Sequence, residues 1–191
     1  ITQSNYLEPG EWYSQDETDK TYQHLNSLRL FQIINIKFNE SESSRDSLVG
    51  KLDCHIYLKK FKLQSYTIEL EGTNSSGNIG GAGNLVYTHK SIFGGAEQFQ
   101  SKVTGAFEIL DQEKFNRIDN TLRLGTELSI DFPKFLLPFL RSDRFVKEYN
   151  PKTTLSAMYN YQERPDYTRT LANLTFGYRW QNRNYLTHYV N

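Results

Sequence analysis

Apolar and polar residues alternate along much of residues 64 to 110, whose sequence is QSYTIELEGTNSSGNIGGAGNLVYTHKSIFGGAEQFQSKVTGAFEIL. The alternating stretches have the length of strands, and first a long Ser/Gly/Asn loop and then a tight Phe-Gly-Gly turn separate them. Alternation with a period of two places one set of side chains on each face of a β-sheet. Neither face has the plain pattern of a soluble core. A sheet with one face against lipid and the other against water gives the same alternation, so both arrangements stay open.

The alternation recurs to the end of the chain and predicts about six strands in this part. They cover residues 66–72, 81–90, 98–109, 122–132, 153–161 and 170–180, of which only 81–90 alternates weakly. The connecting segment PKFLLPFLRSDRFVKEY is too apolar at its start for an ordinary loop and holds two prolines, so we expect a short helical or packed excursion there. Near strand ends lie aromatic residues that suit either the girdle of an outer-membrane barrel or the rim of a soluble sandwich. These are Tyr159, Tyr161, Tyr178 and Trp180.

The N-terminal third has a different organisation. Ser14-Gln15-Asp16-Glu17 has the S-x-x-E pattern of a capping box and predicts a helix over residues 15–30. One face of that helix would carry Thr18, Thr21, Leu25 and Leu28, with Tyr22 beside them. Strands at 33–38 and 51–59 follow. A helix and two strands are too little for a stable domain, so we expect further sequence before residue 1.

Composition and charge narrow the function classes. Tyr and Phe, at 13 and 12 of 191 residues, favour β structure, and a formal net charge of zero gives no electrostatic case for nucleic acid. Mean hydropathy is −0.66 and no apolar run reaches the roughly 18–20 residues of a spanning helix, but a spanning strand needs only about 9–11. The single cysteine, Cys54, alternates with Leu52, Ile56 and Leu58 and is expected to be a small buried hydrophobe.

The residue types that usually carry chemistry form no constellation. The run from Gly77 to Gly83 lacks the Lys-Ser/Thr of a phosphate-binding loop, which predicts a flexible turn. The four histidines are too far apart for a metal site, and no cofactor is expected. Glu69 and Glu71 share a strand face, where a solvated or lumenal stripe explains them better than a glycosidase pair. Because no nucleophile, base and orienting group occur together, an enzyme is not predicted.

Two segments resemble a known family. LEPGEWYSQDETDKTYQHLNSLRLFQIINIKF resembles the second half of a POTRA (polypeptide-transport-associated) domain. YTIELEGTNSSGNIGGAGNLVYTHKSIFGGAEQFQSKVTGAFE resembles the first barrel strands of the BamA/TamA superfamily of outer-membrane assembly factors, most like the versions in Bacteroidota. ELSIDFPKFLLPF and TRTLANLTFGYRWQ resemble later barrel strands. The chain departs from the family in holding only part of a barrel and in lacking the late Arg-Gly-Phe loop.

The resemblance implies a mainly β chain in two parts. Residues 1–63 would be the C-terminal part of a POTRA domain, with a helix and two strands. Residues 64–191 would be the N-terminal portion of a transmembrane β-barrel, with about six antiparallel strands. The chain would lie in the bacterial outer membrane with its N-terminal part in the periplasm. Its partners would be outer-membrane lipid, unfolded outer-membrane client proteins and accessory periplasmic or lipoprotein subunits.

The implied function is protein assembly or translocation at the outer membrane by edge-strand templating, without catalytic residues. The edge that pairs a client strand would be Tyr66, Thr67, Ile68, Glu69, Leu70, Glu71 and Gly72. A second edge, which adds extended peptides to the POTRA sheet, would be Ile33, Ile34, Asn35, Ile36, Lys37 and Phe38. Two alternatives remain at this point: a passive outer-membrane barrel, such as a pore or adhesin, and a soluble β-sheet protein that binds a small ligand.

Overall fold

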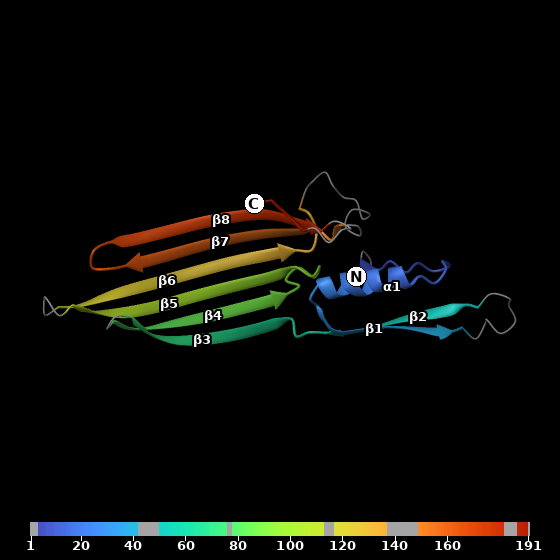
Figure 1. Cartoon of the computed structure of the whole chain (residues 1–191), viewed down its shortest axis with the longest axis horizontal. Helices are drawn as coiled ribbons and strands as arrows, with labels where there is room; N and C mark the ends of the chain where they lie inside the picture. The colour runs from blue at the N-terminus through green and yellow to red at the C-terminus, as the bar shows by residue number, and fades with distance from the viewer. Residues whose placement is uncertain are drawn as a thin grey trace.

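The computed structural model of the chain describes residues 4–41, 50–75, 78–112, 117–136, 149–181 and 187–190. It is mainly β, with one helix and two antiparallel sheets, as the alternation predicted. A helix and a two-stranded sheet lie at one end of a seven-stranded sheet (Figure 1). The elements are α1 (Gln15–Ser27), β1 (Phe31–Glu40), β2 (Leu52–Lys60), β3 (Gln64–Ser75), β4 (Asn78–Lys90), β5 (Gln98–Gln112), β6 (Arg117–Phe132), β7 (Lys152–Glu163), β8 (Thr168–Gln181) and β9 (Thr187–Val190).

Helix α1 starts where the capping pattern predicted. The Ser14 side chain accepts a hydrogen bond from the Glu17 amide at 3.3 Å, which satisfies one of the free amides of the first turn. The helix ends at Ser27, three residues earlier than predicted, because Arg29 adopts a left-handed backbone conformation with φ of 54°. Tyr22, which the pattern placed beside the buried face, is exposed, since it lies about 100° around the helix from buried Thr21.

The helix covers one face of the β1–β2 hairpin. The register places Ile34 opposite Leu58 and Ile36 opposite Ile56, and Ile34, Ile56 and Leu58 pack against the buried cluster that contains Leu25. The hairpin pairs Phe38 with Cys54 further along, and Cys54 is exposed. The prediction of a buried cysteine is therefore wrong. The alternation placed Cys54 on the correct face, but the apolar cluster reaches only as far as Ile56 and Leu58.

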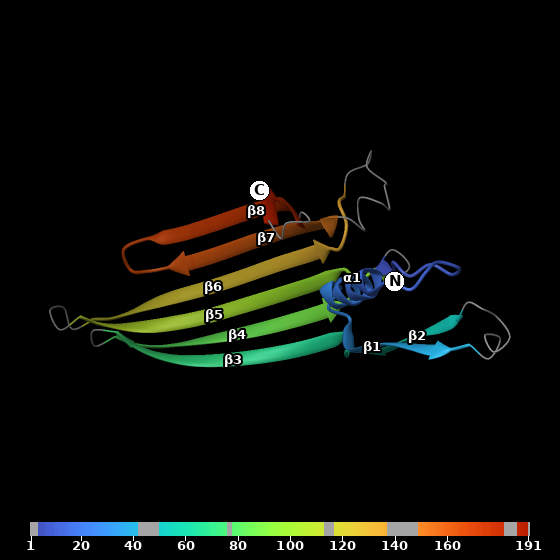
Figure 2. The same cartoon turned by 45° about the vertical axis from the view of Figure 1, so that its right-hand side comes forward.

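The larger sheet is an up-and-down meander in the strand order β3-β4-β5-β6-β7-β8-β9 (Figures 1 and 2). Sheet pairing changes between the end of β2 at Lys60 and the start of β3 at Gln64, next to the predicted division at residues 63 and 64. Strands β3 to β8 have 12 to 16 residues, about twice or more the usual 5–6. The sheet has seven strands instead of about six because the four-residue β9 was too short to give a pattern. Among the described residues β3 and β9 do not pair, so this part of the chain forms an open sheet.

The glycine-rich run is strand, not the predicted flexible turn. Strand β4 starts at Asn78, and the described residues of the run up to Gly83 lie within it. A Cβ on Gly80 would lie 2.7 Å from the Phe107 carbonyl oxygen and 2.8 Å from Thr73 Oγ1, so the neighbouring strands approach too closely for any side chain there. Gly77 and residues 137–148 of the predicted excursion at 133–149 lie outside the described residues.

The connections differ between the two ends of the larger sheet. Away from α1, residues 76–77, 113–116 and 164–167 join successive strands. At the α1 end the connections span residues 91–97, 133–151 and 182–186. The first of these contains the predicted Phe-Gly-Gly turn, with φ of 88° at Gly94 and 71° at Ala96. Ala96 is buried in the apolar cluster under α1, so this turn joins the larger sheet to the small unit.

Candidate functional site: an apolar sheet face and two strand edges

Register assigns the side chains of the larger sheet to two faces, because residues that lie directly opposite each other point to the same side. Tyr66 lies opposite Tyr87, and the same face continues strand by strand to Val190 of β9. Its large apolar members are Tyr66, Ile68, Leu70, Ile79, Leu85, Tyr87, Phe99, Val103, Phe107, Ile109, Leu122, Leu124, Leu128, Ile130, Phe132, Leu155, Tyr159, Tyr161, Leu174, Phe176, Tyr178, Trp180 and Val190. We call this set the apolar face.

The apolar face is uncovered, whereas much of the opposite, polar face is half-buried. Leu70 and Leu174 are 83% and 73% exposed, although Leu is among the residues most often buried in proteins. On β5 the polar-face side chains of Lys102 and Glu108 are half-buried while Phe107 is exposed. Side chains converge on the inner side of a curved sheet, which indicates that the polar face is the concave one. A soluble sandwich has the reverse arrangement, with its apolar face covered by a second sheet.

The polar face carries hydrogen bonds and ion pairs that run across strands. Thr104 donates to Asn84 at 2.8 Å, and Asn84 donates to Glu69 at 3.4 Å. Further from α1, the Glu108 carboxylate lies 3.9 Å from Arg123 and 4.0 Å from Arg164. Such groups need water or charged partners, so the polar face suits an aqueous interior.

Aromatic residues lie at two levels of the apolar face. Tyr159 and Tyr161 lie in its far half, and Tyr178 and Trp180 lie at the α1 end. Tyr161 is opposite Thr170, ten positions before Trp180 on β8. At roughly 3.3 Å per residue, the outermost residues of the two levels, Tyr161 and Trp180, are about 33 Å apart along the strand, or about 25 Å in height for a strand tilted by about 40°. The inner residues, Tyr159 and Tyr178, are about 20 Å apart along the strand. The outermost spacing matches the apolar band of an outer-membrane barrel, about 25 Å.

The first predicted edge, from Tyr66 to Gly72, lies wholly in β3 at the border of the larger sheet. These seven residues pair with β4, from Tyr66 opposite Tyr87 to Gly72 opposite Gly81, and all are exposed. Within the described ranges no strand pairs with the other side of β3. Its outward backbone groups are therefore available to a further strand.

The second predicted edge, from Ile33 to Phe38, lies in β1 of the two-stranded sheet. Ile34, Ile36 and Phe38 are half-buried, while Ile33, Asn35 and Lys37 are exposed. In the part of the chain that the structure describes, β1 has only β2 as a neighbour. The two predicted edges belong to different sheets and do not form one site.

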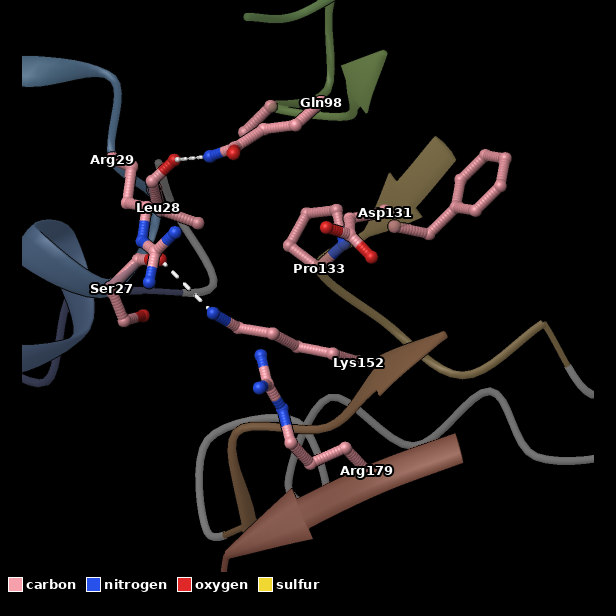
Figure 3. Close-up of a pocket in the computed structure, with 10 residues that line it drawn as sticks. Ser27, Leu28, Arg29, Gln98, Asp131, Pro133, Lys152 and Arg179 are labelled. Carbon is pink, nitrogen blue, oxygen red and sulfur yellow. Dashed lines mark hydrogen bonds between the residues drawn. The ribbon is translucent and has the colours of Figure 1, made fainter. Parts of the chain in front are cut away.

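A site that could not be predicted from the sequence lies between the two units. It is a pocket at the C-terminal end of α1, and three cationic side chains line it: Arg29, Lys152 and Arg179 (Figure 3). They come from the turn after α1, from β7 and from β8. Because more than 120 residues separate Arg29 from the other two, no local motif could have joined them.

Among the described residues, no three His, Cys, Asp or Glu side chains are close enough together to hold a metal ion. Within the same residues, no helix is long and apolar enough to cross a membrane.

The fold thus defines a mainly β protein whose long antiparallel strands segregate apolar from polar side chains. No family model matches the chain, and no curated protein matches it. One solved structure that the chain matches is that of BamA from Haemophilus ducreyi lacking POTRA domains 1–3, at a TM-score of 0.42 and 11% sequence identity. The match covers 95% of this chain and 41% of the BamA chain, so this chain spans about two fifths of that structure's length.

Proposed function

We propose that the chain is part of an outer-membrane β-barrel protein, with its apolar face against lipid and its polar face toward an aqueous lumen. The inverted burial of the two faces carries this proposal, since the apolar side chains are the exposed ones. Contiguous exposed apolar surface of this size is rare on soluble monomers and marks contact with lipid or protein. The aromatic levels, spaced by the height of a membrane band, support lipid as the neighbour.

We further propose that β3 acts as a template for client strands. In lipid, each unpaired N–H or C=O group costs several kcal/mol, so an incoming strand that pairs with the open side of β3 is strongly favoured. This mechanism uses the backbone from Tyr66 to Gly72 and needs no catalytic side chain. Its substrates are unfolded outer-membrane proteins. The β1 edge would bind extended peptides by strand addition in the periplasm, where accessory periplasmic or lipoprotein subunits would also meet the chain.

The membrane part of the proposal can be tested with the two tryptophans, Trp12 and Trp180. Trp180 belongs to the apolar face, whereas Trp12 lies before α1 and is 82% exposed. The Trp12→Phe and Trp180→Phe variants each keep one tryptophan and would be refolded into vesicles with brominated acyl chains. Bromine should strongly quench Trp180 and leave Trp12 nearly unchanged. Equal quenching of the two tryptophans, or a folded protein that does not bind the vesicles, would contradict the proposal and favour a soluble ligand-binding protein.

Templating by β3 can be tested by disulfide scanning in a Cys54→Ser background. Single cysteines at Thr67 or Ile68 would be compared with one at Ser129, which lies on the interior strand β6. An unfolded outer-membrane protein with one cysteine in its terminal strand should form disulfides with the β3 positions in a single register. Cross-links at Ser129 of equal yield would show non-specific contact. Lipid insertion without any β3 cross-link would leave a passive barrel as the function.

A further inference from the structure

Three cations converge in the pocket between the small unit and the larger sheet (Figure 3). Arg29 reaches it from the turn after α1, and Lys152 and Arg179 reach it from neighbouring positions of β7 and β8, where they lie directly opposite each other. All three are close enough for Arg29 and Arg179 to repel the Lys152 ammonium. Arg29 and Arg179 are exposed and Lys152 is half-buried, so water solvates part of this charge. Like charges this close still repel one another, and a carboxylate or a bound anion would relieve that repulsion.

The described residues supply only part of that compensation. Asp131 also lines the pocket, but its carboxylate accepts a hydrogen bond from Thr154 at 2.5 Å. Lys152 donates to the Ser27 carbonyl oxygen at 3.4 Å, a partner without formal charge. Within the described ranges none of the three cations forms an ion pair. Three positive charges against one negative charge leave the pocket with a net charge of +2.

The backbone of Arg29 supports a role for its side chain. Arg29 follows the helix with φ of 54°, and its amide donates to the Asn26 carbonyl oxygen at 3.0 Å. Glycine or asparagine normally occupies this left-handed position, because a Cβ is disfavoured there. An arginine is therefore a poorer choice for ending the helix than glycine would be. This backbone outlier motivates the hypothesis that the guanidinium group has a role in the pocket.

We propose that this pocket binds a phosphate-type oxyanion, held by Arg29, Lys152 and Arg179. A phosphate group carries about −1.5 to −2 at neutral pH, which matches the uncompensated charge. Two guanidinium forks and an ammonium provide the charge-assisted donors that phosphate oxygens prefer. Because Arg29 belongs to the small unit while Lys152 and Arg179 belong to the larger sheet, the anion would tie the two units together. This site is independent of client-strand templating.

The test uses the whole chain refolded in dodecyl maltoside and titrated with inorganic phosphate, with sodium chloride adjusted to hold ionic strength constant. Phosphate should raise the melting temperature saturably. Arg179→Gln and Arg29→Gly should each weaken binding at least about tenfold, the effect of losing one charged hydrogen bond. Without phosphate, Arg29→Gly should melt at the same or a higher temperature, since glycine suits the left-handed turn. Arg169→Gln is the matched control, since Arg169 lies on the same strand and face at the opposite end of the sheet.

The proposal would be overturned if chloride raised the melting temperature as much as phosphate does, or if both arginine variants bound phosphate as the unaltered chain does. Loss of stability in Arg29→Gly without loss of binding would assign the arginine a structural role only.

Competition by phosphatidylglycerol nanodiscs, but not by nanodiscs of a galactolipid without phosphate, would identify a lipid headgroup as the source. Binding of inorganic phosphate without such competition would identify a free phosphate.

Discussion

Single residues set how closely neighbouring strands approach in the larger sheet. Gly80 lies where a Cβ would contact the Phe107 carbonyl oxygen, whereas Gly72 has open space around its Cα. Both glycines lie in long strands and neither has a positive φ. They therefore separate the cost of a steric clash from the general effect of replacing glycine in a strand.

We expect Gly80→Ala to lower the free energy of unfolding by about 1–3 kcal/mol, because a backbone atom must shift to admit the methyl group. Gly72→Ala should leave it nearly unchanged or slightly raised, since alanine reduces the entropy of the unfolded chain. Urea unfolding of both variants in detergent would measure the difference. Equal effects of the two substitutions would show that β4 and β5 do not approach as closely as the structure has them.

The pH dependence of stability should contain a contribution from His24. Burial lowers the pKa of His24 below its usual 6.5, and its ring lies 3.0 Å from the Tyr6 hydroxyl. The unfolded chain therefore takes up a proton first as the pH falls, so the contribution is complete above about pH 6.5 and decreases below it. His24→Phe should lose less stability between about pH 7.5 and 5.5 than the unaltered chain. If the free energy of unfolding had the same pH dependence in His24→Phe and in the unaltered chain, this account would be contradicted.

At the scale of the element, β6 provides the sharpest contrast between the two faces. Leu128 lies in the middle of the apolar face, and its neighbour Ser129 lies on the polar face. Leu128→Arg should destabilise the folded protein in a bilayer by about 2–4 kcal/mol, because it places a charge at the membrane midplane. Ser129→Arg should have little effect, since its side chain would point into water. Urea unfolding in vesicles would measure both, and similar losses would contradict the assignment of the faces.

Strands with side chains large enough to mark both faces were predictable from sequence. On β8, apolar residues such as Leu174 and Phe176 alternate with polar ones, and the predicted range of 170–180 lies within Thr168–Gln181. On β4, Gly81 and Gly83 occupy positions on the apolar face beside Phe107 and Leu70, so the alternation is weak and the strand was expected to start later. A pattern-based prediction fails where close packing demands the absence of a side chain.

The candidate sites were predictable to different degrees. The two strand edges were predicted from the order of the strands along the chain together with the resemblance to a family. That they bind client strands stays a prediction. Sequence could not predict the phosphate pocket, because Arg29, Lys152 and Arg179 come together only when α1 docks against the ends of β7 and β8. Nor could it predict the exposure of Cys54, which depends on how far α1 reaches over the hairpin.

At the scale of the whole molecule, a few contacts join the small unit to the larger sheet. Ala96 lies in the apolar cluster under α1, and Gln98 donates to the Leu28 carbonyl oxygen at 3.3 Å. Lys152 donates a hydrogen bond to the carbonyl oxygen of Ser27, the residue before Leu28. The last carbonyls of a helix have no partner within it, so these two side chains both complete the helix end and hold it to the sheet.

The combined Gln98→Leu and Lys152→Met substitutions should loosen the arrangement of the two units. Spin labels on the native, exposed Cys54 and on a cysteine replacing Thr168 at the far end of β8 would report the distance between them. Double electron–electron resonance should give a broader distance distribution in the double variant than in the unaltered chain. Arg169→Gln is again the control. An unchanged distribution in the double variant would show that Ala96 and its neighbours suffice to hold the units together.

The unequal connections at the two ends of the larger sheet have a consequence for topology. Outer-membrane barrels usually have short turns on the periplasmic side and long loops outside. Here the longest connection, residues 133–151, is at the same end as α1, and residues 164–167 are typical of the opposite end. The proposed periplasmic side of α1 therefore reverses the usual rule. In sealed vesicles, a protease on the α1 side would reach the helix and the hairpin. A protease on the other side would meet connections of two to four residues, so limited proteolysis alone can establish which way the chain is inserted.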